Sequence, residues 1–352
     1  MTRLDHLRGN AVRKRHNART IAALTGNPGC TRRAVLDAAG VDKPRLAQHI
    51  GFPGDFGQSR FALARGNAFE AMLKADGCAL LRSTLGVPDG AAVAYHDLGE
   101  DADDTVRARY DRTRELLAGP VGAMVIDHPM LTLDVAGQRV FLEPDLVAFQ
   151  IEGRLRVVEI KSFAIVDGQA DSAKVAAAAV QAAVYVLALR RLLADLGHDG
   201  ELVSHDVILV CPENFSLRPA AVVVDVRKQL STLRRQLTRL ASVSALIEEL
   251  PPDVSFDLSL PVPALLGSLA TIEARYAPEC LSTCELAIFC RHEAGGTTAA
   301  LGRGVREALG GVDTVAETLA LADGTRAPSP AQAEAAALLR AAALLRAEAL
   351  AG

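Results

Sequence analysis

Residues 141–163 read FLEPDLVAFQIEGRLRVVEIKSF, and this stretch decides the fold. It holds two runs of β-branched and aromatic residues around turn residues 152–154, a pattern that predicts an antiparallel strand pair. Asp145 lies in the first run, and Glu159 and Lys161 lie two positions apart in the second. Because side chains alternate along a strand, Glu159 and Lys161 project from the same face. Burying these charges together would be costly unless a metal and a substrate use them.

The residue types in this trio suit phosphodiester hydrolysis. Asp145 and Glu159 supply the hard oxygen ligands that Mg²⁺ prefers. A metal at this point would lower the pKa of a bound water and neutralise charge on the phosphorane, while Lys161 would orient or activate that water. An ExK tripeptide by itself is common on solvated strands, so the interpretation depends on its surroundings.

Helical periodicity predicts where the long helices lie. Residues 1–120 are expected to be mainly helical, with apolar residues at helical spacing over 59–84 and a charged helix over 101–118. A further helix is expected over 172–195, with Ser172 as its N-cap. The last helices are expected over 227–249 and 331–350.

The expected strands form two groups, before and after the helix over 172–195. The first group is an antiparallel meander made by the β-rich runs 122–126, 130–135, 139–151 and 155–163. The second group consists of the runs 204–211 and 220–226. The order is therefore helix, three or four strands, helix, strand, which predicts an α/β protein with a mixed sheet.

Two further motifs lie on the helices that flank the strands. Gln181 and Tyr185 form a QxxxY pattern, whose spacing places both side chains on one face of the helix. Upstream, the run RGNAFE ends in Glu70. Each motif also has an ordinary interpretation, with Tyr185 as a core residue and Glu70 as a surface acid. Six candidate residues nevertheless follow one another in the order Glu70, Asp145, Glu159, Lys161, Gln181 and Tyr185.

This ordered set resembles the RecB-like branch of the PD-(D/E)XK nuclease superfamily. The resemblance implies a restriction-endonuclease-like αβββαβ core with a mixed sheet, a helical N-terminal part and a helical C-terminal tail. The residues that it assigns to a catalytic Mg²⁺ or Mn²⁺ are Glu70, Asp145 and Glu159. It makes Lys161 the fourth catalytic residue, and it implies that Gln181 and Tyr185 contact the DNA strand.

The implied activity is metal-dependent hydrolysis of DNA phosphodiester bonds, on single strands or at ends, in repair, recombination or defence. The sequence has no GxxxxGK[ST] loop, so any unwinding would come from a helicase or another repair or defence protein. The alternative is a catalytically inactive subunit that binds nucleic acid or takes part in assembly, with a nuclease fold and a structural metal centre. No site carboxylate or lysine is missing, which argues against that alternative.

The cysteines predict a second metal centre. One precedes the nuclease-like stretch and three follow it in CLSTCELAIFC: Cys30, Cys280, Cys284 and Cys290. This distribution resembles the iron–sulfur RecB-like nucleases, among them the CRISPR-associated exonucleases and the AddB nuclease domain, and implies a [4Fe–4S] cluster. The spacing here is C-x3-C-x5-C instead of C-x2-C-x5-C, so Zn²⁺ bound by four cysteines stays the alternative. The cluster is either structural or redox-sensing. Cys78 and Cys211 are expected to be buried free thiols.

Composition sets the wider limits. The 352 residues are 50% apolar and carry a formal charge of −4, which argues for a sizeable core and against a surface that coats nucleic acid throughout. Residues 1–33 carry eight Arg or Lys against one acid, as a phosphate-binding patch or a solvated arm. The polar N-terminus and the lack of a long apolar run predict a cytoplasmic protein without a membrane span.

A proline-rich boundary near 251–263 precedes the cysteine cluster. We expect residues 1–294 to form the nuclease domain, closed by the cysteine-bound metal, and residues 295–352 to form a helical tail. Within the tail, 301–324 resemble a helix-hairpin-helix with a Gly-Gly turn, and a plain two-helix cap is the alternative. The histidines His128, His205 and His292 show no metal-ligand spacing and receive no role.

Overall fold

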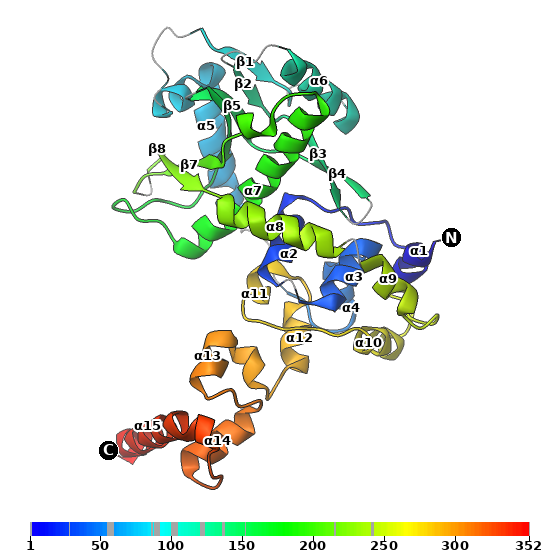
Figure 1. Ribbon diagram of the computed structural model, residues 1–352, viewed down its shortest axis with the longest axis vertical. Helices are drawn as coiled ribbons and strands as arrows, with labels where there is room; N and C mark the ends of the chain where they lie inside the picture. Colours follow the sequence, from blue (N-terminus) through cyan, green and yellow to red (C-terminus); the bar gives the residue numbers. More distant parts are fainter. Residues whose placement is uncertain are drawn as a thin grey trace. The chain divides into compact units, whose positions relative to one another are not determined.

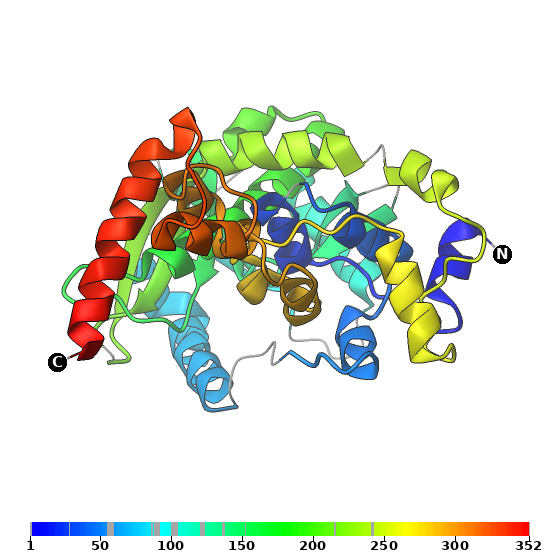
Figure 2. The ribbon, with the colours of Figure 1, turned by 90° about the horizontal axis from the view of Figure 1, so that it is seen from below.

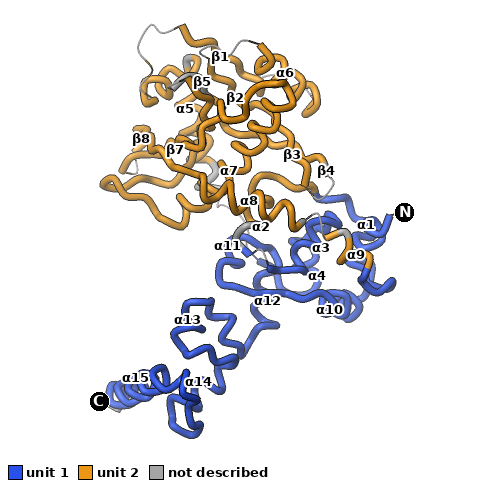
Figure 3. The backbone as a smooth tube through the Cα atoms, viewed as in Figure 1, with its two compact units in different colours: residues 1–14, 26–56, 249–352 blue, residues 15–25, 57–248 orange. Residues whose placement is uncertain are grey.

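The computed structural model describes residues 2–27, 29–54, 60–85, 87, 92–99, 105–119, 124–135, 138–151, 153–214, 216–240 and 243–351. The chain divides into two compact units (Figure 3). Unit 1 consists of Met1–Lys14, Gly26–Phe56 and Glu249–Gly352, and unit 2 of Arg15–Thr25 and Gly57–Glu248. Unit 1 is therefore built from both ends of the chain, and unit 2 from its middle.

Among the described residues of unit 2, six strands form a mixed sheet in the order β1-β2-β5-β6-β7-β8 (Figure 1). Their bounds are β1 Ala94–Asp97, β2 Met124–Asp127, β5 Leu146–Ile151, β6 Arg154–Ile160, β7 Asp206–Pro212 and β8 Pro219–Asp225. The pairs β1–β2 and β6–β7 are parallel, and the other neighbours are antiparallel. The predicted α/β class with a mixed sheet is confirmed.

The strand pairing departs from the predicted meander. β3 (Leu131–Val135) and β4 (Gln138–Leu142) form a separate two-stranded sheet, so β2 pairs with β5 across this hairpin. The stretch 1–120, expected to be mainly helical, also contains one strand among its described residues, β1. β1 has only four residues, AYHD, and so short a run carries no periodicity that separates a strand from a helix.

The long helices of unit 2 lie close to the predicted ranges. Their bounds are α5 Arg60–Thr84, α6 Val106–Ala118, α7 Ser172–Asp195, α8 Arg227–Leu240 and α9 Val243–Glu249, after the shorter α2 Ala18–Gly26. The expected helix over 227–249 is thus two helices, and 241–242 lie outside the described residues. The N-cap of α7 is Asp171 instead of Ser172, since its carboxylate accepts from the backbone N–H groups of Ala173 and Lys174 at 2.9 and 3.1 Å.

Helices cover both faces of the central strands. Ile208 and Val210 of β7 lie in one core cluster with α5, and Leu209 between them lies in another with Ala178 of α7. Figure 2 shows α5 and α8 on opposite sides of the sheet, and α8 packs against α7. Because Glu159 of β6 pairs with Leu209 in parallel register, its side chain lies on the α7 face.

Helix α7 is long and apolar enough by composition to cross a membrane. In the structure, 56% of its most apolar window is buried inside the protein. The core helix of a globular unit passes the same test of length and hydropathy, and α7 packs against the strands β6 and β7 and against α8.

The described residues of unit 1 contain helices and no named strand. Their bounds are α1 Arg3–Arg8, α3 Thr31–Ala39, α4 Lys43–His49, α10 Val262–Ala270, α11 Cys280–Thr283, α12 Ala287–Glu293, α13 Arg303–Ala308, α14 Val315–Asp323 and α15 Ala333–Ala351. Backbone hydrogen bonds join the two chain ends, from Phe256 N to Leu7 O (2.7 Å) and from Arg32 N to Glu273 O (3.0 Å). In the tail, Thr314 caps α14 by accepting from Glu317 N.

Candidate functional site

Asp145, Glu159 and Lys161 meet where β5 begins and β6 ends. β5 and β6 are antiparallel with Leu146 opposite Val158, which brings the residues flanking this pair together. Asp145 Oδ2 accepts a hydrogen bond from the backbone N–H of Ile160 at 2.7 Å. Lys161 Nζ lies 3.8 Å from Asp145 Oδ2 and donates a hydrogen bond to Glu159 Oε2. The structure therefore brings together the three residues that the sequence singles out.

The trio places two carboxylates, Asp145 and Glu159, beside the single ammonium of Lys161. Glu159 is fully buried, and its Oε1 has no hydrogen-bond partner among the described residues. Burial raises the pKa of Glu159 to about 7, although Lys161 acts in the opposite direction. Burial also raises the pKa of Asp145 above its ordinary value. For Lys161, burial lowers the pKa, but Glu159 and Asp145 outweigh it and raise the pKa overall.

Glu70 joins the same group of charges from helix α5. Its carboxylate contributes to raising the pKa values of Asp145 and Glu159, which places the three acids within electrostatic reach of one another. Helix α5 passes close to the end of β6. A side-chain carbon placed at Gly66 of α5 would lie only 3.4 Å from Cβ of Ser162, which follows β6. Glu70 Oε1 also forms an ion pair with Lys74 at 2.6 Å, one turn further along α5.

The QxxxY pair lies beside the trio on α7. Tyr185 is buried, and its hydroxyl accepts a hydrogen bond from Gln181 Nε2 at 3.2 Å. Burial and the neighbouring Glu159 raise the pKa of Tyr185. This position makes Tyr185 part of the wall around Glu159, while Gln181 is half-buried at the edge of that wall.

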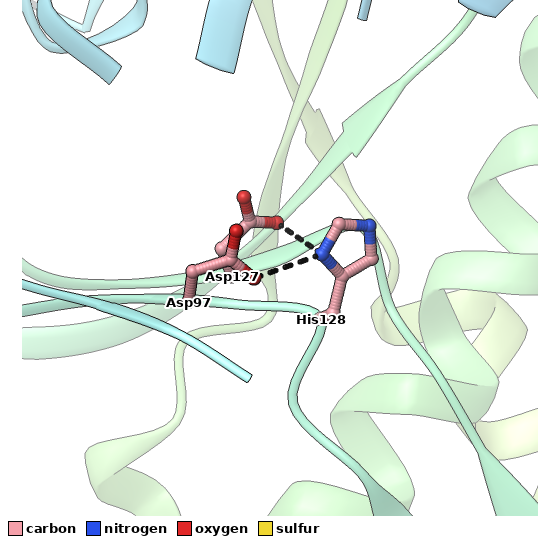
Figure 4. A group of neighbouring side chains, drawn as sticks. All are labelled: Asp97, Asp127 and His128. Atoms are coloured by element: carbon pink, nitrogen blue, oxygen red, sulfur yellow. Dashed lines mark hydrogen bonds and ion pairs between the residues drawn. The ribbon is translucent and has the colours of Figure 1, made fainter. Parts of the chain in front are cut away.

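A second charged group, around His128, was missed by the reasoning from sequence. His128 Nδ1 lies 3.1 Å from Asp127 Oδ1 and 3.4 Å from Asp97 Oδ1 (Figure 4). The ligand atoms of these residues all lie within 4.8 Å of one another, so the group could hold a metal ion. Asp127 and His128 adjoin in sequence at the end of β2, but Asp97 comes from β1, whose strand was not predicted. A further candidate group, His205, Asp206 and Asp225, is more exposed.

The four cysteines of the predicted metal centre all belong to unit 1. Cys280, Cys284 and Cys290 are buried, and Cys30 is partly buried. Helix α11 is a single turn that begins at Cys280, and Cys284 follows it as the C-cap in extended conformation, with its backbone N–H donating to Cys280 O. Burial raises the pKa of Cys290 to about 12, and the charges of Cys284 and Cys30 add to this effect. Cys78 and Cys211 are buried free thiols, as predicted.

Cationic and amide groups surround these sulfurs. Arg32 Nη1 donates to Cys290 Sγ at 3.5 Å, and Asn27 Nδ2 donates to Cys280 Sγ at 3.2 Å. Burial raises the pKa of Cys284, and Lys43 and Arg33 act against it. Arg32 and Arg33 are each only 4% exposed. Those two members of the basic stretch therefore lie buried near the cysteines and belong neither to a solvated arm nor to an exposed patch.

The four cysteine sulfurs do not form one compact group. Among the described residues, the groups whose ligand atoms all lie within 4.8 Å of one another do not include three of these cysteines. The structure thus contains possible metal-binding acidic and histidine groups in unit 2 and buried cysteines in unit 1. In comparisons with known proteins, no protein-family model matches the chain and no curated protein matches it.

Proposed function

We propose that the protein is a metal-dependent deoxyribonuclease of the RecB-like PD-(D/E)XK type, with Asp145, Glu159 and Lys161 at its centre. The observation that carries the proposal is the fully buried Glu159, whose Oε1 has no hydrogen-bond partner in the described part of the chain and lies near a second carboxylate. Leaving a buried carboxylate oxygen unsatisfied costs free energy, and structures keep such atoms where an ion or a reaction uses them. A divalent cation between Asp145 and Glu159 would satisfy this oxygen.

The residues present fit such a cation. Asp145 and Glu159 would hold Mg²⁺ or Mn²⁺, with Glu70 as the third carboxylate. When bound, the cation would polarise the phosphodiester and make hydroxide available at neutral pH. Lys161, held by Glu159, would direct its ammonium at the charge that develops on the phosphate. Tyr185 would exclude water from the Glu159 side, and Gln181 would contact the strand.

The order of the elements supports a PD-(D/E)XK core in unit 2. Helix α5, strands β2, β5 and β6, helix α7 and strand β7 come in the order αβββαβ along the chain, with other elements between them. In this interpretation helix α6, strands β1 and β8 and the β3–β4 hairpin are additions to the core. The carboxylates then lie on the two strands, and Gln181 and Tyr185 on the helix, to which the RecB-like resemblance assigns them.

The proposed substrate is DNA, as single strands or ends, in repair, recombination or defence, with a helicase or related protein as partner in the cytoplasm. Digestion of labelled single-stranded DNA with Mn²⁺ tests this proposal, and we expect cleavage that chelators abolish. Binding of the strand without cutting, unaffected by Asp145→Ala, would favour the catalytically inactive subunit instead.

We also propose that Cys30, Cys280, Cys284 and Cys290 hold a [4Fe–4S] cluster. A tetrahedral Zn²⁺ with bonds of about 2.3 Å requires sulfurs about 3.8 Å apart. The spread of the four sulfurs, no three of which fall within 4.8 Å of one another, favours the larger cluster, which binds each thiolate to a different iron. All three residues between Cys280 and Cys284 lie in the single turn α11.

Replacement of one cluster cysteine tests this second proposal. Anaerobically purified protein is expected to be brown, with absorbance at roughly 400 nm and about four irons per chain. Cys284→Ser should lose the colour and the iron and should melt at a lower temperature, because the cluster ties together residues 250 positions apart in sequence, Cys30 and Cys280. Cys78→Ser, which alters a buried cysteine of unit 2, should keep the iron. A colourless wild-type protein that contains zinc would contradict the cluster.

A further inference from the structure

The ammonium group of Lys74 lies among three groups that are all typical metal ligands. Lys74 Nζ is 2.6 Å from Glu70 Oε1, 2.7 Å from Asp127 Oδ1 and 3.1 Å from His128 Nε2. The Lys74 side chain is 11% exposed and that of Asp127 is 1% exposed. Both carboxylates lie within ion-pair distance of the Lys74 ammonium. A cation therefore already occupies this Glu–Asp–His set.

The imidazole of His128 is oriented as in a metal site. Its Nδ1 faces the carboxylates of Asp127 and Asp97 (Figure 4), which leaves Nε2 directed at Lys74. Metal-binding histidines characteristically donate their other ring N–H to a carboxylate in this way. Asp127 is itself oriented by a hydrogen bond from the Tyr95 hydroxyl to Asp127 Oδ2 at 2.8 Å. The arrangement is that of a metal site with a lysine in the position of the metal. Glu70, Asp127 and His128 stand where ligands would be, and Tyr95 and Asp97 orient two of them.

The backbone ties this set to the proposed catalytic strand. His128 N donates to Asp145 O at 3.3 Å, and Arg109 Nη2 donates to His128 O at 2.7 Å. His128 has φ +49°, a conformation that residues other than glycine rarely adopt. Such a conformation persists when the surrounding contacts require it, and here it places Nε2 beside Lys74 and Glu70.

We propose that the Lys74 ammonium takes the place of a second metal ion beside the Asp145–Glu159 site, so that this site works with a single divalent cation. The inference rests on the proposed function only where it names that neighbouring site as catalytic. The contacts of Lys74 have hydrogen-bond lengths, whereas metal ligands lie at about 2.0–2.2 Å, so a metal cannot share the position with the ammonium. Lys74 also holds Glu70 in the group of acids without using a metal to do so.

The test is the number of Co²⁺ ions bound per chain before and after removal of the ammonium. Lys74→Met keeps the aliphatic length and should bind one more equivalent of Co²⁺ than the wild-type chain, with the visible absorption of an imidazole-ligated ion. Lys74→Met combined with His128→Ala should lose that absorption. Lys228→Met, on an exposed part of α8, should leave the count unchanged.

The same counts separate this inference from the proposed function. If the nuclease site binds no metal, the wild-type chain binds no Co²⁺ at that site, yet Lys74→Met still gains one equivalent over the wild-type count. Introducing Asp145→Asn and Glu159→Gln alongside Lys74→Met makes the same comparison without the proposed catalytic metal. An unchanged Co²⁺ count in folded Lys74→Met would overturn the inference.

Two further outcomes bear on the inference if the variant is unstable. Folding of Lys74→Met that depends on Co²⁺, followed by circular dichroism, would support it, because the metal would then replace the lost ammonium. A variant that stays unfolded with Co²⁺ would count against it. In the unmodified protein, visible absorption of an imidazole-ligated Co²⁺ ion that His128→Ala removes would overturn the inference, since Lys74 would not be excluding a metal.

Discussion

Lys161→Ala is expected to lower Mn²⁺-dependent cleavage of single-stranded DNA by at least about 10²–10³-fold, the usual effect of removing one group that stabilises transition-state charge. The fold should remain, because Lys161 lies just after β6. Its backbone N–H donates a hydrogen bond to Val210 O, and the substitution does not remove that bond. Initial rates on an end-labelled strand, with circular dichroism alongside, measure both effects.

The matched control is Lys228→Ala, which removes an exposed lysine of the same unit and should cut at the wild-type rate. Lys161→Arg keeps the positive charge but not its compact geometry, so we expect it to recover only part of the activity. Full activity in Lys161→Ala would remove the proposed site, whatever the fold of the variant.

Glu159→Gln is expected to make the metal-free protein more stable at pH 8 while abolishing cleavage. Burial raises the pKa of Glu159 from 4.5 to about 7. A carboxyl with a raised folded pKa stabilises the folded state below its unfolded pKa, and this contribution is lost as the pH rises through the folded pKa. The metal-free wild type should therefore lose on the order of 3 kcal/mol of stability between about pH 4.5 and pH 7 from this group.

Denaturant unfolding at several pH values, with and without Mn²⁺, measures this second prediction. The variant should lack the fall in stability between about pH 4.5 and 7, because its amide does not ionise. Mn²⁺ at 100 times its Kd should stabilise the wild type by about 2.7 kcal/mol and the variant by much less. Glu115→Gln, an exposed acid on α6, should behave as the wild type in both respects. Equal stabilisation of Glu159→Gln by Mn²⁺ would show that the metal does not bind at Glu159.

The framework of the site was predictable because its signals are local. Helices α5 and α7 lie within a residue or two of the ranges that periodicity predicts. The alternation of side chains on β6 likewise places Glu159 and Lys161 on one face, opposite to Val158. The N-cap of α7 was misplaced by one residue, since adjacent Asp171 and Ser172 are both good capping residues and only the backbone path selects between them.

The surroundings of the site were not predictable, because they depend on contacts between elements far apart in sequence. β1 is too short to carry a periodic signal, so Asp97 could not be placed beside His128. In the sequence, Lys74 has the spacing of an ordinary surface lysine one helical turn after Glu70. Its pairing with Asp127 requires α5 to pack against the end of β2.

By itself, the sequence determined the α/β class, the long helices and the order of the candidate residues along the chain. These follow from periodicity, capping and turn residues, which act over a few neighbouring positions. Tertiary structure alone decided which charges meet and how strongly they interact. Glu159 has a raised pKa because it is buried on the face of the sheet that α7 covers, and Lys74 meets His128 because α5 and β2 converge. Burial and the contact of distant charges are properties of packing, and no local pattern encodes them.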